Sequence, residues 1–181
     1  MKNLTIVFTF LFSISCSAQK SGSNKTGGVK PVRVTVTGKL MQTNSYCGGI
    51  APTPEMVAES QKPVPYAGKV FYVRKGKVNS TKGEVITSFT VDAKGEYSFQ
   101  ITPGTYSIIQ AKQLKPLTRT DLKSTESLQV DAKCMKAWWA KPYYLLEVKT
   151  TNITIPDWSI HHPCFVSGDI PCISYTGPMP P

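Results

Sequence analysis

The chain has 181 residues and a formal net charge of +10, from 21 Lys and Arg against 11 Asp and Glu. Its 3 Trp, 8 Tyr and 7 Phe can build a packed core, which excludes a chain that is disordered throughout. The length favours a single domain. Beyond the N-terminus no apolar run is long enough to span a bilayer, so we expect no transmembrane span in the mature chain.

Residues 1–18 have the composition of a bacterial export signal. A positive charge precedes the apolar run at 4–14, and small residues follow it. Two outcomes remain open. Cleavage after Ala18 would release a protein to the periplasm or the extracellular space, whereas lipidation of Cys16 would give an outer-membrane lipoprotein. Ser13 stands where lipoprotein signals usually carry Leu, Val or Ile, and we expect the first outcome.

Export would place the remaining cysteines in an oxidising compartment, where disulfides form and persist. The mature chain has four of them, Cys47, Cys134, Cys164 and Cys172, so we expect two disulfides. Three pairings are possible from the sequence alone. We expect Cys47–Cys134 and Cys164–Cys172, because the Ser-Gly-Asp of residues 167–169 would turn the chain back between the second pair.

Alternating apolar and polar residues predict a mainly β fold. The alternation predicts strands at 32–37, 69–75, 85–91, 96–101, 105–110, 143–149 and 152–155. A turn at Asp92–Gly95 places glycine where a positive φ costs little, and Pro103–Gly104 marks another turn. Strands and turns at this spacing indicate an antiparallel sandwich or barrel.

Three segments interrupt the strand pattern. Residues 41–68 form a proline-rich insertion, in which Pro54–Glu59 predicts one or two helical turns with proline at the first position. Residues 127–139 predict a short helix, and residues 161–181 an extended proline-rich tail. The helix rests on apolar residues at helical spacing, namely Leu128, Ala132, Met135 and Trp139.

The segment Thr90–Tyr106, TVDAKGEYSFQITPGTY, resembles the signature of carboxypeptidase-regulatory-like domains, with Val91 as one additional residue. The resemblance covers about residues 32–111. It implies a transthyretin-like (prealbumin-like) Greek-key β-sandwich of about seven strands. We expect this domain over residues 32–160, after a Gly- and Ser-rich flexible tether at 19–31. Most domains of this family are non-catalytic modules of exported or surface proteins.

The segment His161-His162-Pro163-Cys164, with Cys172 eight residues later, carries both histidines of the chain. Imidazole and thiolate are ligands that zinc and copper prefer, so these four His and Cys residues are candidate metal ligands if the cysteines stay reduced. Adjacent histidines in a strand point to opposite faces, so only one of them would join such a site. A periplasmic copper- or zinc-binding protein is therefore the alternative function.

Candidate catalytic groups are few. Cys47 precedes Gly48-Gly49, whose amides would suit an oxyanion hole with His161 or His162 as base. A catalytic cysteine needs a free thiolate, which the expected disulfides remove. No His-Glu-x-x-His zinc-peptidase motif is present. We expect no catalytic residue and no enzymatic activity.

Trp138, Trp139 and Tyr143 form an aromatic cluster that would suit a sugar-binding platform. Adjacent tryptophans cannot both face one side of a helix. We expect one of them in the core and the other beneath the 41–68 insertion.

Basic residues are concentrated in two stretches, residues 19–54 and 62–83, neither of which holds an acid. A basic face would attract an anionic glycan, lipopolysaccharide or a membrane surface, whereas lysines on strand edges also discourage edge pairing. Nucleic acid is not an expected partner of an exported chain. The sequence predicts a non-catalytic exported binding or scaffold module of the bacterial cell envelope, whose partner is an envelope protein or an anionic glycan.

Overall fold

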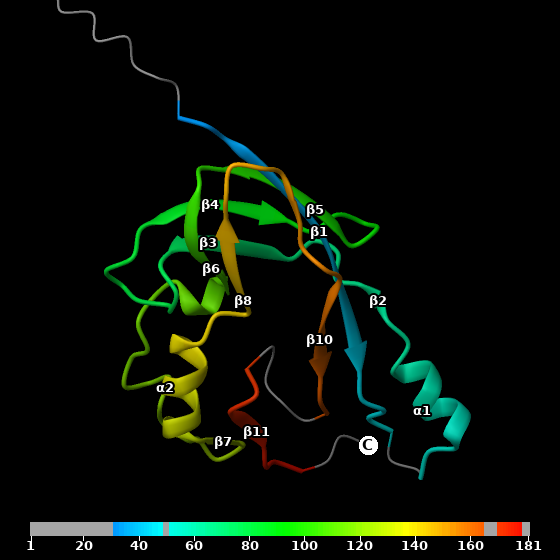
Figure 1. Ribbon diagram of the computed structural model, residues 1–181. Coiled ribbons are helices and arrows are strands. Elements are labelled where there is room, and N and C mark those ends of the chain that lie inside the picture. Colours follow the sequence, from blue (N-terminus) through cyan, green and yellow to red (C-terminus); the bar gives the residue numbers. More distant parts are fainter. Residues whose placement is uncertain (1–30, 49–50, 165–169, 179–181) are drawn as a thin grey trace, which may run out of the picture. The chain divides into compact units, whose positions relative to one another are not determined.

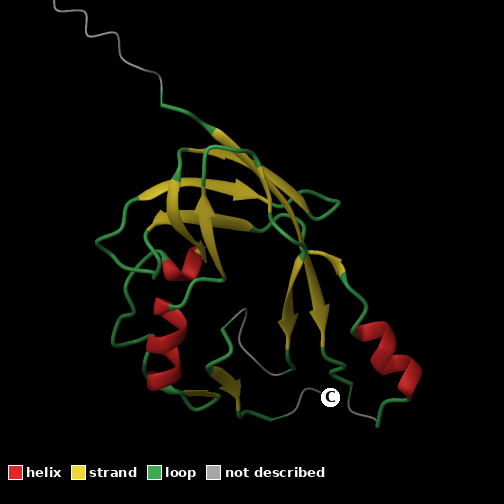
Figure 2. Ribbon diagram, viewed as in Figure 1, coloured by secondary structure: helices red, strands yellow, loops and turns green. Residues whose placement is uncertain are grey.

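The computed structural model describes residues 31–48, 51–164 and 170–178, and these are mainly β with two short α-helices (Figures 1 and 2). The export signal, the tether up to residue 30 and the expected turn at 167–169 lie outside the described residues. Within the described part of the chain, no helix has the length and apolarity needed to cross a membrane.

The elements follow one another in a simple order. The strands are β1 (Val34–Asn44), β2 (Val64–Pro65), β3 (Val70–Lys75), β4 (Val85–Thr90), β5 (Glu96–Ile101), β6 (Gly104–Gln110), β7 (Leu128–Val130), β8 (Tyr144–Val148), β9 (Ile153–Thr154), β10 (Trp158–His162) and β11 (Ile173–Tyr175). The helices are α1 (Pro54–Ser60), the 3₁₀ helix η1 (Ala111–Gln113) and α2 (Ala132–Ala140).

Two sheets pack face to face and form a β-sandwich. One sheet is antiparallel throughout, with the order β4-β3-β6-β8. The other is organised around β1. The main core lies between the sheets, and Val36, Phe71 and Ile108 are almost completely buried in it. Alternate residues of β5 point into this core, as the period of two predicts.

Strand β1 is long because it belongs to two pairings in succession. Its first half pairs antiparallel with β5 and parallel with β9, whereas its second half pairs parallel with β10 and antiparallel with β2. The sequence predicted antiparallel pairing throughout, so the two parallel pairings correct that prediction. Residues 41–44, placed by the sequence in a loop-like insertion, extend β1 because β10 pairs with them.

Gly38 lies in the middle of β1 and neither ends nor bulges the strand. It is paired with Tyr97 of β5, whose ring lies over the position that a side chain at residue 38 would occupy. The predicted turn at Asp92–Gly95 is confirmed. Gly95 has φ = 85°, and the Asp92 carboxylate accepts the N–H groups of Lys94 and Glu96 at 2.8 Å.

The 41–68 segment contains the helix that the sequence predicted at Pro54. Thr53 caps α1, and Pro54 occupies its first turn, where the missing N–H carries no cost. None of the residues of α1 is buried. Figure 1 shows α1 and α2 on opposite sides of the β1–β10 pair.

A second, smaller core lies around α2. Met135, Ile170 and Cys172 are buried there, and β7 pairs with β11 beside them. The predicted helix at 127–139 is corrected at its start, since residues 128–130 form β7. The carboxylate of Asp131 accepts the N–H groups of Lys133 and Cys134 at 2.9 Å, which begins α2 at Ala132.

The disulfides pair differently from the expectation. Cys47 is bonded to Cys164 and Cys134 to Cys172, with Cα–Cα distances of 5.4 and 5.5 Å. The parallel pairing of β10 with β1 places residue 162 beside residue 44, so the chain segments that follow both strands run together. The Cys47–Cys134 and Cys164–Cys172 pairings are therefore wrong.

Candidate functional site

A groove of about 500 Å³ lies between the segment that follows β6 and the second core. Its apolar lining includes Leu114, Leu117, Met135, Trp138, Ile170 and Ile173. Lys112, Lys115 and Asp121 also line it, and all three side chains are exposed. An apolar, aromatic lining with a few charged groups is typical of a ligand-binding site.

The aromatic cluster predicted as a platform contributes one residue to this groove. Trp138 is half-buried, packs against the second core and donates from Nε1 to the hydroxyl of Tyr143 at 3.4 Å. Trp139 donates to the backbone oxygen of Lys115 at 2.6 Å, on the side of the sandwich that carries α2. It therefore does not lie beneath the 41–68 segment as expected. Tyr143 packs against the main core, where its ring meets Phe71.

A buried glutamine fixes α2 to the sandwich. Gln113 is fully buried, and its Nε2 donates to the backbone oxygens of Trp138 and Lys141, both at 2.9 Å. Both carbonyls lie at the C-terminal end of α2, where intrahelical donors run out, and the Trp138 oxygen also accepts the backbone N–H of Lys141 at 3.2 Å. Asn79 adds hydrogen bonds of 2.8 Å to the carbonyls of Gln113 and Trp139. The groove wall is therefore anchored through polar contacts that the sequence pattern of this segment did not indicate.

Arg74 belongs to the basic stretch at 62–83, but its side chain is buried, with 4% exposure. Its two terminal guanidinium nitrogens donate to the backbone oxygens of Ser80 at 2.7 Å and Leu114 at 3.0 Å. Burial lowers the pKa of this guanidinium from its usual value. Arg74 therefore joins the loop between β3 and β4 to the segment that follows β6, and it is not part of an exposed basic face.

Asp121 gives the groove a negative group in a fixed position. Its carboxylate accepts from the hydroxyl of Thr118 at 2.6 Å and from the backbone N–H of the same residue at 2.7 Å. These two bonds, the hydroxyl first, lower the pKa of Asp121 from its usual value. The carboxylate therefore stays ionised at neutral pH, in the groove that Lys112 and Lys115 also line.

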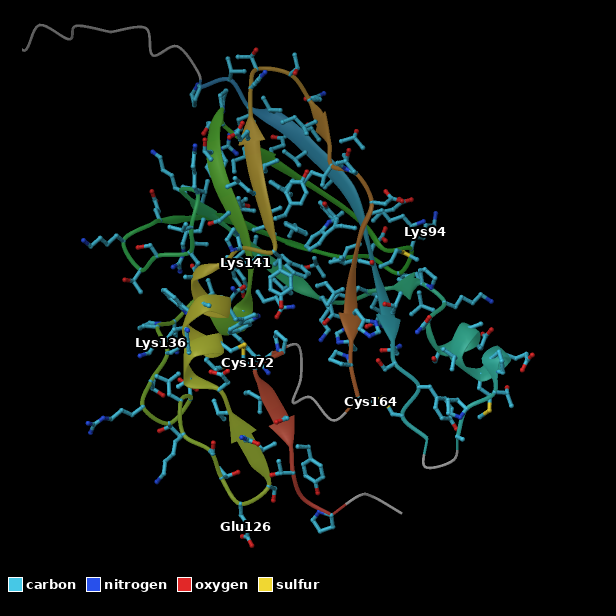
Figure 3. All side chains as sticks on the ribbon, turned by 60° about the horizontal axis from the view of Figure 1, so that its bottom comes forward. Lys94, Glu126, Lys136, Lys141, Cys164 and Cys172 are labelled. Carbon is cyan, nitrogen blue, oxygen red and sulfur yellow. A yellow bond between two sulfur atoms is a disulfide. The ribbon has the colours of Figure 1, made fainter. Side chains whose placement is uncertain are left out.

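The candidate metal ligands are not brought together. Cys164 and Cys172 belong to different disulfides and lie apart, as Figure 3 shows. His161 is hydrogen-bonded to the hydroxyls of Thr43 and Ser45, both at 3.0 Å. The ring of His162 packs instead against another aromatic ring. The proposed His and Cys set therefore does not form one ligand set, and the described residues contain no group of three or more His, Cys, Asp or Glu suited to a metal.

The candidate nucleophile is also unavailable as a thiolate. The sulfur of Cys47 is bonded to Cys164. A disulfide-bonded sulfur cannot form the thiolate that nucleophilic catalysis needs.

Comparisons with known proteins add little to this geometry. No protein-family model matches the chain, and a search of curated proteins found no significant match. Among solved structures, the Bacillus anthracis TIE protein superposes with a TM-score of 0.35 at 11% identity, covering 72% of this chain and 17% of that one. GBS52, the minor pilin of Streptococcus agalactiae, superposes with a TM-score of 0.34 at 10% identity, covering 78% of this chain and 48% of that one. This chain spans less than half of either protein, and similarity at this level carries no conclusion about function.

Proposed function

We propose that this protein is a non-catalytic, exported binding module of the bacterial cell envelope, and that its groove binds an anionic glycan. The observation that carries the proposal is the placement of Trp138 in the groove with Lys112 and Lys115. An aromatic ring offers an apolar face to a sugar ring, and exposed ammonium groups attract negative charge.

Two disulfides support export, since such bonds persist in oxidising compartments and are rare in the cytosol. The same bonds support a non-catalytic role, because they occupy the four cysteines of the mature chain. We infer that the sandwich is a transthyretin-like Greek-key domain. The supporting feature is the signature segment at Thr90–Tyr106, which forms the turn before β5, β5 itself, and the turn into β6.

The test is binding of the mature chain to purified lipopolysaccharide, with uncharged dextran as the neutral glycan. We expect binding to lipopolysaccharide alone, weakening as salt rises from 50 to 300 mM because the Debye length shortens. Lys115→Ala should weaken binding several-fold. The substitution leaves the backbone oxygen of residue 115 in place, so Trp139 keeps its hydrogen bond. Trp138→Phe keeps an apolar ring and should weaken binding less than Trp138→Ala.

Lys82→Ala is the matched control, since it removes an exposed lysine between β3 and β4 that does not line the groove. Equal losses from Lys82→Ala and Lys115→Ala would mean that net charge, not the groove, governs binding. Equal binding to dextran and lipopolysaccharide, or no binding to either, would overturn the proposed function.

A further inference from the structure

A second cavity, of about 220 Å³, adjoins the groove at η1. Ala111 and Lys112 line both spaces, so the two are neighbours. Tyr66, Lys69, Phe71 and Gln110 also line the cavity, and among the described residues none that lines it is acidic. A cavity of this volume equals that of about seven liquid-water molecules, so it suits one functional group and the atoms next to it rather than a whole oligosaccharide.

Gln110 lines this cavity and carries a side-chain donor that has no acceptor in the described part of the chain. The residue is 6% exposed, and its side-chain Nε2 is buried with no hydrogen-bond partner among the described residues. Gln110 and Gln113 form a capping box at η1, and the backbone N–H of Gln110 donates to the Gln113 side-chain oxygen at 3.0 Å. The amide nitrogen is thus the part of this side chain that lacks an acceptor. A buried donor without an acceptor is unfavourable, and an oxygen atom of a ligand would supply the missing acceptor.

Two lysines give the same cavity a positive potential. The ammonium of Lys69 lies 4.9 Å from the ring centroid of Tyr66, a cation–π distance that holds the charge at the cavity wall. Tyr66 itself is 2% exposed and packs edge-on against Phe71 with 6.5 Å between ring centroids. Lys112 carries an exposed ammonium on η1, between the cavity and the groove.

We propose that this cavity binds the carboxylate of an acidic sugar whose ring lies in the adjoining groove. Lys69 and Lys112 supply the charge, and the Nε2 of Gln110 supplies a neutral hydrogen bond. This inference rests on the proposed function and narrows its ligand to glycans that contain uronic acids or similar carboxylated sugars. The cavity's two lysines and single amide match a compact anionic group, and the groove that shares Lys112 provides the aromatic surface.

The experiment follows the side-chain amide of Gln110 by ¹⁵N nuclear magnetic resonance in the mature chain. Galacturonate and a short oligogalacturonate are the probes, and the methyl-esterified oligomer is the uncharged control. We expect the Gln110 NH₂ pair to shift and saturate with both acids and to stay in place with the ester. An unchanged Gln110 NH₂ pair at saturating oligogalacturonate would overturn the proposal.

Variants test whether the lysines act from this cavity. Lys69→Gln and Lys112→Gln should each raise the Kd for oligogalacturonate about tenfold, as expected for the loss of a hydrogen bond to a charged group. Lys77→Gln removes an exposed lysine beyond the far end of β3 and should leave the Kd unchanged. Equal effects of all three substitutions would overturn the proposal. Gln110→Met keeps the length of the side chain and should weaken binding without loss of the folded amide spectrum.

Competitors identify the kind of anion. Inorganic phosphate that displaces oligogalacturonate and shifts the Gln110 amide more strongly would overturn the carboxylate assignment. Tighter binding of poly-L-glutamate than of oligogalacturonate would overturn the proposal that the ligand is a glycan. The experiments distinguish a wrong carboxylate assignment for the cavity from a wrong assignment of glycan binding to the groove. If Lys115→Ala weakens lipopolysaccharide binding while Lys69→Gln changes nothing, the groove stands and the carboxylate cavity does not.

Discussion

Tyr97 lies directly across the β1–β5 ladder from Gly38, and its ring occupies the space that a side chain at residue 38 would need. The ring cannot easily move away. It is 5% exposed, stacks on Phe89 with 4.4 Å between centroids, and its hydroxyl accepts from the indole N–H of Trp158 at 3.1 Å.

Gly38→Ala should therefore destabilise the sandwich by about 1–3 kcal/mol, the usual cost of adding atoms to a filled core. Urea unfolding monitored by circular dichroism measures this loss. Thr35→Ala, at a partly exposed position of the same strand, is the control and should cost less than Gly38→Ala. If Gly38→Ala unfolds at the same urea concentration as the unmodified protein, the ring of Tyr97 does not restrict the side chain at residue 38.

Gln113→Met should lower the free energy of unfolding by about 1–3 kcal/mol, the usual cost of leaving a hydrogen-bonding group without its partner. The substitution keeps the length of the side chain but removes the donor that Gln113 gives to the carbonyls of Trp138 and Lys141. Hydrogen exchange should show that backbone amides in the last turn of α2 lose protection before those of β3. Gln100→Met, at an exposed position of β5, serves as the matched control and should change stability by less than 0.5 kcal/mol, about the usual limit for surface substitutions. Uniform loss of protection throughout the chain would contradict a local anchoring role.

The turn around Asp121 should weaken in acid. Its pKa in the folded protein lies below the unfolded value of about 3.9, so the contribution to stability is complete above that value and is lost as pH falls through the folded pKa. Thr118→Val removes the hydroxyl but keeps the backbone N–H, and should raise the pKa of Asp121 part of the way to its ordinary value. Side-chain carboxyl shifts followed by nuclear magnetic resonance from pH 2 to 6 give both values. An Asp121 pKa unaffected by Thr118→Val would mean that the hydroxyl is not the main cause.

The two disulfides should act on different parts of the molecule. Cys134→Ser/Cys172→Ser should cost about 2–4 kcal/mol, open the second core to hydrogen exchange and weaken binding in the groove, since Met135 and Ile173 line it. The same double change at Cys47 and Cys164 removes a bridge outside the groove lining and should leave binding intact. Peptide mapping without reduction checks the pairing first. Peptides that link Cys47 to Cys134 would contradict the structure.

Local features were predictable because their causes are local. The period of two located β5, Pro54 marked the start of α1, and the aspartate and glycine of the 92–95 segment marked a turn. The helix that the sequence placed at 127–139 illustrates the limit. Leu128 fits both a helical spacing and the alternation of a short strand, and the capping aspartate at 131 is the signal that separates the two.

Pairings between distant segments were not predictable from the residues. The parallel contact of β10 with β1 joins positions about 118 residues apart, and nothing in either segment specifies the other. The cysteine pairing follows from that contact, so it was missed for the same reason. Within the candidate site, Trp138 could be predicted as a binding residue because aromatic side chains suit sugar-binding platforms. Gln113 and the cavity beside η1 depend on how the 111–121 segment folds, and that segment has no periodic pattern.

The cysteine bridges interleave along the chain, since Cys134 lies inside the loop closed by Cys47 and Cys164 whereas Cys172 lies outside it. For a chain that leaves the cytoplasm N-terminus first, Cys47 and Cys134 are the first two of these thiols to meet an oxidant, and they are not partners. Neither native bridge can close until the segment with Cys164 has emerged. An oxidase that joined these two thiols during such transport would form a non-native bond, and thiol–disulfide exchange would then be needed to reach the observed pairing.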